Sequence, residues 1–167
     1  MEVVPFDPRH AAAFRELNLA WITMHFQVEP KDLEVLGDPS RSLLERGGAI
    51  FIAEAAGVAI GCVALIPHGD DGTLELGKMA VAEEHRGRGL GRRLLTRAIS
   101  HARSVGAPKV YLESNTKLAA AMHLYESVGF RRVPDRTASP YRRVDVAMVL
   151  DLRPTNETGG DVGSDGE

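Results

Sequence analysis

The chain has 167 residues, of which 44% are hydrophobic and 26% charged, and its formal net charge is −3. This length and composition suit one globular domain with a hydrophobic core of its own. The negative charge argues against a general nucleic-acid binder, which is normally basic overall. The single cysteine, Cys62, excludes an internal disulfide framework and fits a reducing compartment, so we expect a cytoplasmic protein.

The first half of the chain predicts a strand, helical segments and a hairpin. MEVVPF predicts a short strand and no signal peptide, and residues 8–26 carry an apolar stripe at helical spacing. A short helical piece, VEPKDLEVLGDP, precedes another helical turn over residues 40–45. The runs AIFIAEA and VAIGCVALI predict two strands joined by a tight turn. Because Glu54 and two glycines interrupt this apolar region, we expect a hairpin and no membrane span.

The second half predicts alternating strands and helices. In the strand TLELGKMAV (residues 73–81) the apolar positions change parity at Gly77, so this strand is buried on both faces or carries a bulge there. Helices are expected over residues 90–105 and 117–128, the second with Ser114, Asn115 or Thr116 as its N-cap. The remaining strands are expected over residues 109–114, 130–133 and 142–152.

The stretch HRGRGLGRR, residues 85–93, lies between the strand and the helix that follows it. Glycines let the backbone approach a ligand closely, and a helix N-terminus exposes unpaired N–H groups and a positive dipole end. Together these features predict an anion site, usually for phosphate. The stretch lacks the Gly-Lys-Ser/Thr of a Walker loop, and its glycine spacing departs from the dinucleotide fingerprint.

Two separated motifs carry a resemblance to a known family. Residues 86–91, RGRGLG, match the loop R/Q-x-x-G-x-G/A, and NTKLAAAMHLYESVGF contains an Asn that opens a helix ending in Leu-Tyr-Glu and Gly-Phe. With LELGKMAV as a fourth strand, the chain resembles the GCN5-related N-acetyltransferases (GNAT), in a bacterial subgroup of unassigned acceptor. The resemblance covers roughly residues 3–152.

The resemblance implies an α/β (α+β) fold: a mixed, mostly antiparallel sheet of about six to seven strands with splayed central strands, flanked by helices. We therefore expect one acetyltransferase domain over residues 1–152. The acidic, glycine-rich segment over residues 153–167 lacks apolar periodicity and is expected to be a disordered tail. The family also allows a homodimer.

In this family the glycine loop holds the pyrophosphate of acetyl-coenzyme A (acetyl-CoA), and the fourth strand pairs with its pantetheine arm. The resemblance thus implies acetyl-CoA as co-substrate and no metal. Asn115 would bond the cofactor arm or cap its helix. The residues expected to bind the cofactor are Met79, Ala80, Val81, Arg86, Gly87, Arg88, Gly89, Leu90, Gly91, Arg92 and Asn115.

The implied chemistry is direct attack of a neutral amine on the thioester, which needs a proton acceptor and a proton donor. Tyr125 occupies the position of the family's acid, and its phenol, with a reference pKa of about 10, is protonated at neutral pH. It could instead be a core tyrosine. Glu75 is the candidate base, directly or through water, or it only orients the ammonium group. His123 is a weaker candidate, because it points to another face of the helix than Tyr125.

The acceptor is expected to meet the first helices and the last strands. The candidate residues there are Trp21, His25, Phe26, Glu29 and Tyr141. Trp21 and Phe26 could also be core residues, and Glu29 could meet a cationic amine. The leading hypothesis is a primary amine of a small or amino-acid-like molecule. The alternatives are acetylation of a peptide N-terminus or lysine, or a non-catalytic acyl-CoA sensor. The net charge and few aromatic residues disfavour RNA binding through the arginines, and no membrane partner is expected.

Overall fold

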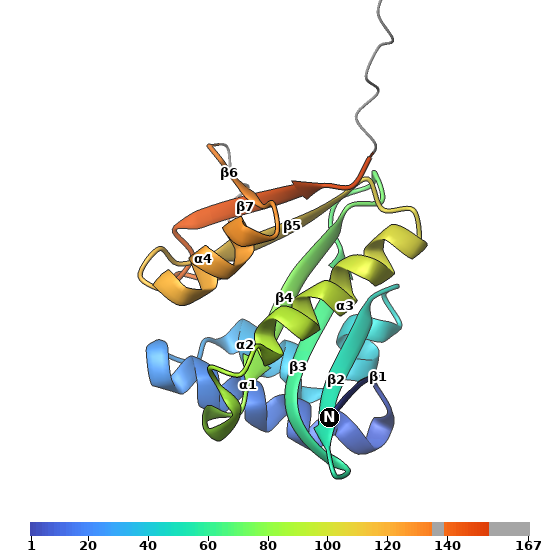
Figure 1. Cartoon of the computed structure of the whole chain (residues 1–167), viewed down its shortest axis with the longest axis vertical. Coiled ribbons are helices and arrows are strands. Elements are labelled where there is room, and N and C mark those ends of the chain that lie inside the picture. The colour runs from blue at the N-terminus through green and yellow to red at the C-terminus, as the bar shows by residue number, and fades with distance from the viewer. Residues whose placement is uncertain (135–138, 154–167) are drawn as a thin grey trace, which may run out of the picture.

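The computed structural model describes residues 1–134 and 139–153 (Figure 1). One sheet contains seven strands in the order β1-β2-β3-β4-β5-β7-β6. Every neighbouring pair is antiparallel except β4 and β5, which are parallel. The mixed, mostly antiparallel sheet predicted from the sequence is thus confirmed. The strands are β1 (Glu2–Pro5), β2 (Ala49–Ala55), β3 (Val58–Pro67), β4 (Leu74–Val81), β5 (Lys109–Ser114), β6 (Arg131–Val133) and β7 (Val146–Asp151).

Helices cover both faces of this sheet (Figure 1). The apolar sides of α1 and α2 pack on one face, over residues such as Ile52 and Cys62. On the other face, α3 and α4 pack over residues such as Leu76 and Leu112. Each helix therefore buries one side against the sheet, as an amphipathic helix requires. The helices are α1 (Ala11–His25), α2 (Pro30–Gly37), α3 (Leu90–Ser104) and α4 (Ala119–Ser127), with single turns η1 (Pro8–His10), η2 (Ser40–Leu44) and η3 (Glu83–His85).

Strand β4 contains the bulge that the sequence suggested. Cys62 pairs with Ala80 and Ala64 pairs with Gly77, so two residues of β4 stand opposite Val63 alone. Lys78, inside the bulge, has a φ of 50°. This extra residue is the reason why the apolar positions change parity after Gly77. The Cys62 thiol donates a hydrogen bond to the Lys78 carbonyl at 3.3 Å, which supports the bulge from the neighbouring strand.

Beyond the bulge, β4 and β5 separate. They are paired only over residues 74–76 of β4 and 110–112 of β5. Figure 1 shows β5 and β7 diverging from β4 towards α4. This opening, which we call the fork, matches the splayed central strands expected from the sequence. It leaves the β5-facing edge of the second half of β4 without a strand partner among the described residues.

Three boundaries differ from the expectations. The first helix opens with the η1 turn, which Asp7 caps through its side chain. Helix α4 begins only at Ala119, because the Asn115 side-chain oxygen instead accepts from the Lys117 N–H in the preceding turn. Strand β7 begins at Val146 and not at residue 142.

The late start of β7 has a side-chain cause. The Asp145 carboxylate accepts hydrogen bonds from the N–H and the hydroxyl of Thr116, both at 2.8 Å. The Asn115 amide donates to the Arg143 carbonyl at 2.8 Å. Residues 142–145 are therefore held as a loop beside the end of β5. Most of the expected disordered tail, from residue 154 on, lies outside the described residues. Within the described part of the chain, no helix combines the length and apolar character needed to cross a membrane.

Candidate active site

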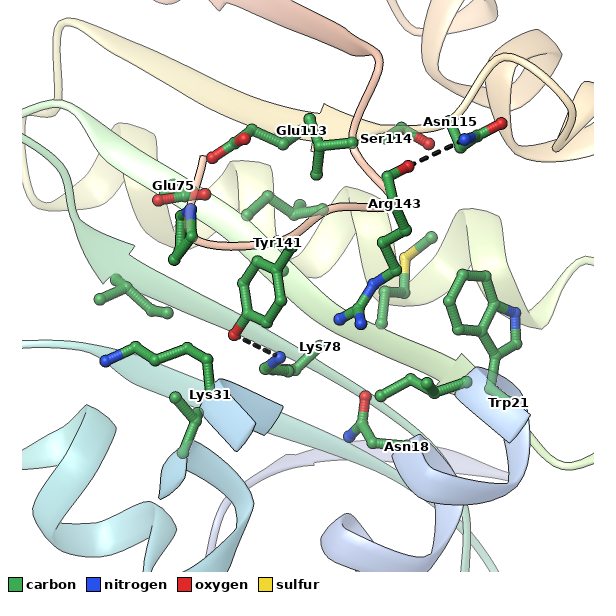
Figure 2. A pocket seen from close by; sticks show the side chains of 18 of the residues that line it. Asn18, Trp21, Lys31, Glu75, Lys78, Glu113, Ser114, Asn115, Tyr141 and Arg143 are labelled. Atoms are coloured by element: carbon green, nitrogen blue, oxygen red, sulfur yellow. Dashed lines mark hydrogen bonds between the residues drawn. The ribbon is translucent and has the colours of Figure 1, made fainter. Parts of the chain in front are cut away.

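A cavity of about 360 Å³ lies at the fork (Figure 2). Residues from α1, α2, β4, β5, α4 and the loop before β7 line it. Both predicted catalytic residues, Glu75 and Tyr125, belong to this lining. They come from opposite faces of the sheet: Tyr125 packs with the core beneath α3, whereas Glu75 alternates with Leu74 and Leu76 and points to the α1 side. The cavity therefore connects the two faces through the fork.

The glycine loop adjoins the end of β4. Gly87 and Gly89 have φ values of 74° and 76°, in the left-handed region that favours glycine. Gly89 is the N-cap of α3 and supplies no side-chain acceptor. Among the described residues, none of the backbone N–H groups over residues 87–92 donates a hydrogen bond. A row of free N–H groups at a helix N-terminus is an anion cradle, and it fits the pyrophosphate of acetyl-CoA.

The arginines of this loop take different positions. The Arg86 Nε donates to the Val81 carbonyl at 3.0 Å, so this side chain closes the end of β4 behind the loop. The Arg92 guanidinium donates to the Ser127 hydroxyl at 2.9 Å, beside the cradle on the α4 side. Arg88 and Arg93 are exposed. Arg93 Nη2 donates to the Met1 carbonyl at 3.5 Å.

Tyr125 is nearly buried, with 8% of its surface exposed. Its ring meets that of Phe130 edge to face, with the ring centroids 5.9 Å apart. Burial raises the pKa of its phenol to about 12. The hydroxyl therefore keeps its proton at neutral pH and can donate it. His123 on the same helix is exposed and does not line the cavity.

Glu75 lies in an acidic cluster that sequence reasoning did not anticipate. Burial and the neighbouring charge of Glu113 raise the pKa of Glu75, and His68 opposes this shift. The His68 Nδ1 lies 3.3 Å from the Glu75 Oε2. Figure 2 shows the Glu75 and Glu113 carboxylates facing each other across the top of the cavity. Sequence reasoning did not place Glu113 at this site, because KVYLES looks like an ordinary strand.

The expected acceptor residues divide into two groups. Trp21, Phe26 and Tyr141 line the cavity, whereas His25 and Glu29 do not. The His25 ring packs against Trp21, with centroids 5.1 Å apart, outside the set of residues that line the cavity. Glu29, expected to meet a cationic amine, accepts hydrogen bonds from the Arg142 N–H at 3.0 Å and from Arg143 at 3.2 Å. The Glu29 carboxylate is thus already paired with a cation of the protein itself, Arg143.

A buried ion network beneath the cavity, centred on Asp32, is the largest feature that the sequence did not predict. The Asp32 side chain is fully buried, and both its oxygens accept from Arg143, at 2.6 and 2.8 Å. Lys78 Nζ lies 3.3 Å from Asp32 Oδ1 and donates to the Tyr141 hydroxyl at 3.0 Å (Figure 2). Burial alone would raise the pKa of Asp32, but the Arg143 hydrogen bonds and the Lys78 charge hold it below its ordinary value. Burial lowers the pKa of Lys78.

Comparison with known proteins gives a consistent assignment. The sequence model of the acetyltransferase (GNAT) family matches residues 12–130. The chain is 30% identical over 122 residues to N-acetyltransferase 8F1 of Rattus norvegicus, covering 71% of this chain and 55% of that protein. It is 36% identical over 138 residues to the N-acetylaspartate synthetase of Danio rerio, covering 78% and 47%. The chain thus spans about half the length of these relatives. Since both are eukaryotic, the expected bacterial subgroup stays a prediction.

Solved structures show the same fold. A GNAT acetyltransferase of Staphylococcus aureus superposes with a TM-score of 0.81 at 19% identity, covering 91% of this chain and 99% of that one. The protein yncA of Salmonella typhimurium, solved with its cofactor acetyl-CoA, superposes with a TM-score of 0.70 at 25% identity, covering 98% and 99%. Within residues 1–134 and 139–153, no three His, Cys, Asp or Glu side chains form a group that could hold a metal ion.

Proposed function

Because this chain belongs to the GNAT family of acetyltransferases, we propose that it is an acetyl-CoA-dependent N-acetyltransferase acting on the primary amine of a small, amino-acid-like molecule. One observation carries the proposal. A proton acceptor, Glu75, and a proton donor, Tyr125, line one cavity from opposite faces of the sheet, at a fork that adjoins an uncapped anion cradle.

The chain's own residues fit acetyl-CoA. The N–H groups over residues 87–92 are free for a pyrophosphate. The unpaired edge of β4 over residues 79–81 can take an extended arm as a further strand would. Bound acetyl-CoA would supply the acetyl thioester and a thiolate leaving group.

Proton transfer is what the side chains of the cavity contribute. An ammonium acceptor must lose a proton before its nitrogen can attack, and Glu75 lies where it can accept one. Because burial raises the pKa of Glu75 towards neutrality, its carboxylate is a stronger base than an exposed glutamate. The Tyr125 phenol supplies the proton that the leaving sulfur needs. Neither role requires a metal ligand.

The far side of the cavity favours an acceptor that also carries a carboxylate. The Tyr141 hydroxyl accepts from Lys78, so its own proton is available to a ligand. Burial raises the pKa of Tyr141, which keeps that proton in place. An acceptor with its amine at Glu75 could therefore place a carboxylate near Tyr141 and Lys78. The zebrafish relative is named for an N-acetylated amino acid, which supports this class.

A panel of amines tests the proposal. Purified protein with acetyl-CoA is offered amino acids, their decarboxylated amines, polyamines and short peptides, with thiol release and product mass as readouts. We expect saturable release and a product heavier by one acetyl group for amino acids. Coenzyme A binding without acetylation of any member would favour the acyl-CoA sensor instead. Preferential acetylation of peptides would favour the N-terminal or lysine acetyltransferase.

A further inference from the structure

The acidic cluster at the fork arises from strand register. In the parallel pair β4 and β5, Glu75 stands opposite Tyr111, so Glu113, two residues further on, points to the same face. Glu113 lies just beyond the last paired residue, where the strands begin to separate. Gly77, two residues after Glu75 on β4, also lines the cavity, and a Cβ there would meet no atom within 4 Å. The absence of a side chain at Gly77 leaves room beside the two carboxyl groups.

One carboxyl oxygen of Glu113 is left without a hydrogen bond in the described part of the chain. Its Oε2 is buried and has no hydrogen-bond donor among the described residues. Two ionised carboxylates in such a site repel each other, and the buried Glu113 oxygen lacks the donor that it needs. The neighbouring Glu113 carboxyl group, together with burial, raises the pKa of Glu75. A single shared proton therefore relieves the repulsion and brings a donor between the two groups.

His68 gives this cluster a contact with solvent. Its ring stacks on Tyr111 at 4.2 Å between centroids, with Nδ1 3.3 Å from Glu75 Oε2. About a third of the His68 side chain is exposed, at 31%. The Glu75 side chain is exposed to a similar extent, at 29%, so the imidazole stands beside the open side of the pair and offers it a group that can pass a proton to water.

We propose that Glu75 and Glu113 form one proton-sharing pair, which exchanges its proton for the ammonium group of the acceptor, with His68 as the route by which that proton leaves. The inference rests on the proposed acetyl transfer and adds Glu113 and His68 to its machinery. Two half-buried carboxyl groups that form no ion pair with a Lys or Arg among the described residues make a site for one –NH₃⁺ group, since its three N–H donors can reach both residues.

The protons balance over one cycle. The ammonium enters, and the shared proton leaves through His68 to solvent. The bound ammonium then gives one proton back to the pair, and the neutral nitrogen forms the C–N bond as the C–S bond breaks. Its second proton replaces the one that Tyr125 gives to the sulfur. One proton has been released to solvent, and both Tyr125 and the pair are restored.

Three of the other charged groups around the cavity are paired elsewhere and do not neutralise the two carboxyl groups. Lys78, from the bulge of β4, is held by Asp32 and by the Tyr141 hydroxyl. Arg143, from the loop before β7, is taken up by Asp32 and Glu29. Lys31 of α2 pairs with Glu34 at 3.0 Å. The residues that line the cavity from α1 are uncharged. Arg46, which follows η2, also lines the cavity, and its guanidinium keeps its charge at every pH of interest. Among the described residues, His68 is the group in contact with the pair that can gain or lose a proton.

The first test needs no acceptor. In the full-length protein with ¹³C-labelled glutamate, the Glu75 carboxyl resonance is titrated by NMR. We expect a midpoint above the ordinary glutamate value of about 4.3 and a curve in two steps, as coupled groups show. Glu113→Gln should lower this midpoint and leave one step, while Glu126→Gln, half exposed on α4, should change nothing. If the Glu113→Gln and Glu126→Gln variants give the same Glu75 curve as the wild type, the pair does not exist, whether or not the protein is an enzyme.

The second test uses any amine that the wild type acetylates. Removing the Glu113 charge lowers the pKa of the remaining base, so in Glu113→Gln the acidic limb of kcat/KM against pH should move to lower pH. We also expect a loss of about tenfold in kcat/KM, smaller than the roughly 10²–10⁴-fold effect of removing a general base itself, because Glu75 is retained. A loss of activity with an unmoved limb would show that Glu113 is only structural. If no amine is acetylated, the proposed function fails, and the NMR titration still decides the pair.

Discussion

The cofactor side and the acceptor side of this molecule are built in different ways. The glycine loop is a continuous stretch whose binding groups are backbone N–H groups at the start of α3. The acceptor side is held by side chains that are distant in sequence: Lys78 lies 46 residues from Asp32, and Arg143 lies 111 residues from it. A backbone site can be found from glycine spacing alone, whereas a side-chain network is apparent only once the chain has folded.

The largest loss of stability should come from replacing Asp32, the centre of the ion network on the acceptor side. Asp32→Asn removes the carboxylate that Lys78 pairs with and leaves Arg143 with Glu29 alone, in a largely buried site, which costs about 3–5 kcal/mol. For a protein of this size the melting temperature should fall by roughly 10 °C. Coenzyme A affinity of the folded fraction, measured below the transition, should be retained. Glu34→Gln, on the exposed side of α2, is the matched control and should cost close to nothing.

The same variant carries a pH signature. The pKa of Asp32 is lowered in the folded protein. Its contribution to stability is therefore complete above the unfolded value and is lost as pH falls through the folded one. The difference in melting temperature between wild type and Asp32→Asn should shrink in acid. A difference that stays constant down to the lowest pH would contradict the ionised network.

On the cofactor side, affinity for coenzyme A should depend on the backbone conformation of the glycine loop. Gly89→Ala puts a side chain at a φ of 76°, which costs about 1 kcal/mol or more and shifts the cradle. We expect about a tenfold weaker affinity for coenzyme A by calorimetry, the equivalent of roughly 1.4 kcal/mol. Gly37→Ala is the control, because its Cβ would meet nothing within 4 Å and its φ is not positive. Equal coenzyme A affinities for the two variants would show that the N–H groups of the glycine loop do not bind the cofactor.

A smaller effect, a gain in stability rather than a loss, is expected when Glu75 at the fork is replaced. The pKa of Glu75 is raised, so its favourable contribution exists at low pH and is lost as pH rises through the folded pKa. Glu75→Gln should therefore raise the melting temperature at pH 7 by a few degrees, for about 1 kcal/mol. The gain should vanish in acid. A loss of stability at pH 7 would mean that the ionised carboxylate has a partner that the fork does not show.

No reaction with a thiol reagent is expected at Cys62 of β3, which lies beside the bulge of β4. The Cys62 side chain is fully buried, and burial raises the pKa of its thiol to about 12. A thiol reagent should leave the native protein unlabelled and should modify one thiol per chain in denaturant. Rapid labelling of the native protein would mean that the bulge of β4 opens, and the fork would then be mobile rather than preformed.

Local patterns were enough to predict much of the fold and little of the acceptor side. The parity change at Gly77 indicated either a bulge or a strand buried on both faces, and the structure has the bulge. Glycine spacing predicted the loop, because both features depend on neighbours in sequence. Asn115 was expected as a helix cap or a cofactor ligand: the N-cap of α4 is instead Leu118, the Asn115 amide donates to the Arg143 carbonyl, and its contact with the cofactor stays a prediction. Glu113 and Asp32 were missed, since an acidic residue in a strand or in a first helical turn is ordinary until its partners are known.

The central claim is that the chemistry happens between Glu75 and Tyr125, separately from cofactor binding. Its most direct test measures turnover and acetyl-CoA dissociation constant in Tyr125→Phe, with His123→Ala, exposed on the same helix, as control. We predict that turnover falls about 100-fold in Tyr125→Phe, as expected for loss of a general acid, while the dissociation constant stays within about twofold and His123→Ala behaves as wild type. Unchanged turnover in Tyr125→Phe, or a loss confined to acetyl-CoA affinity, would contradict the account.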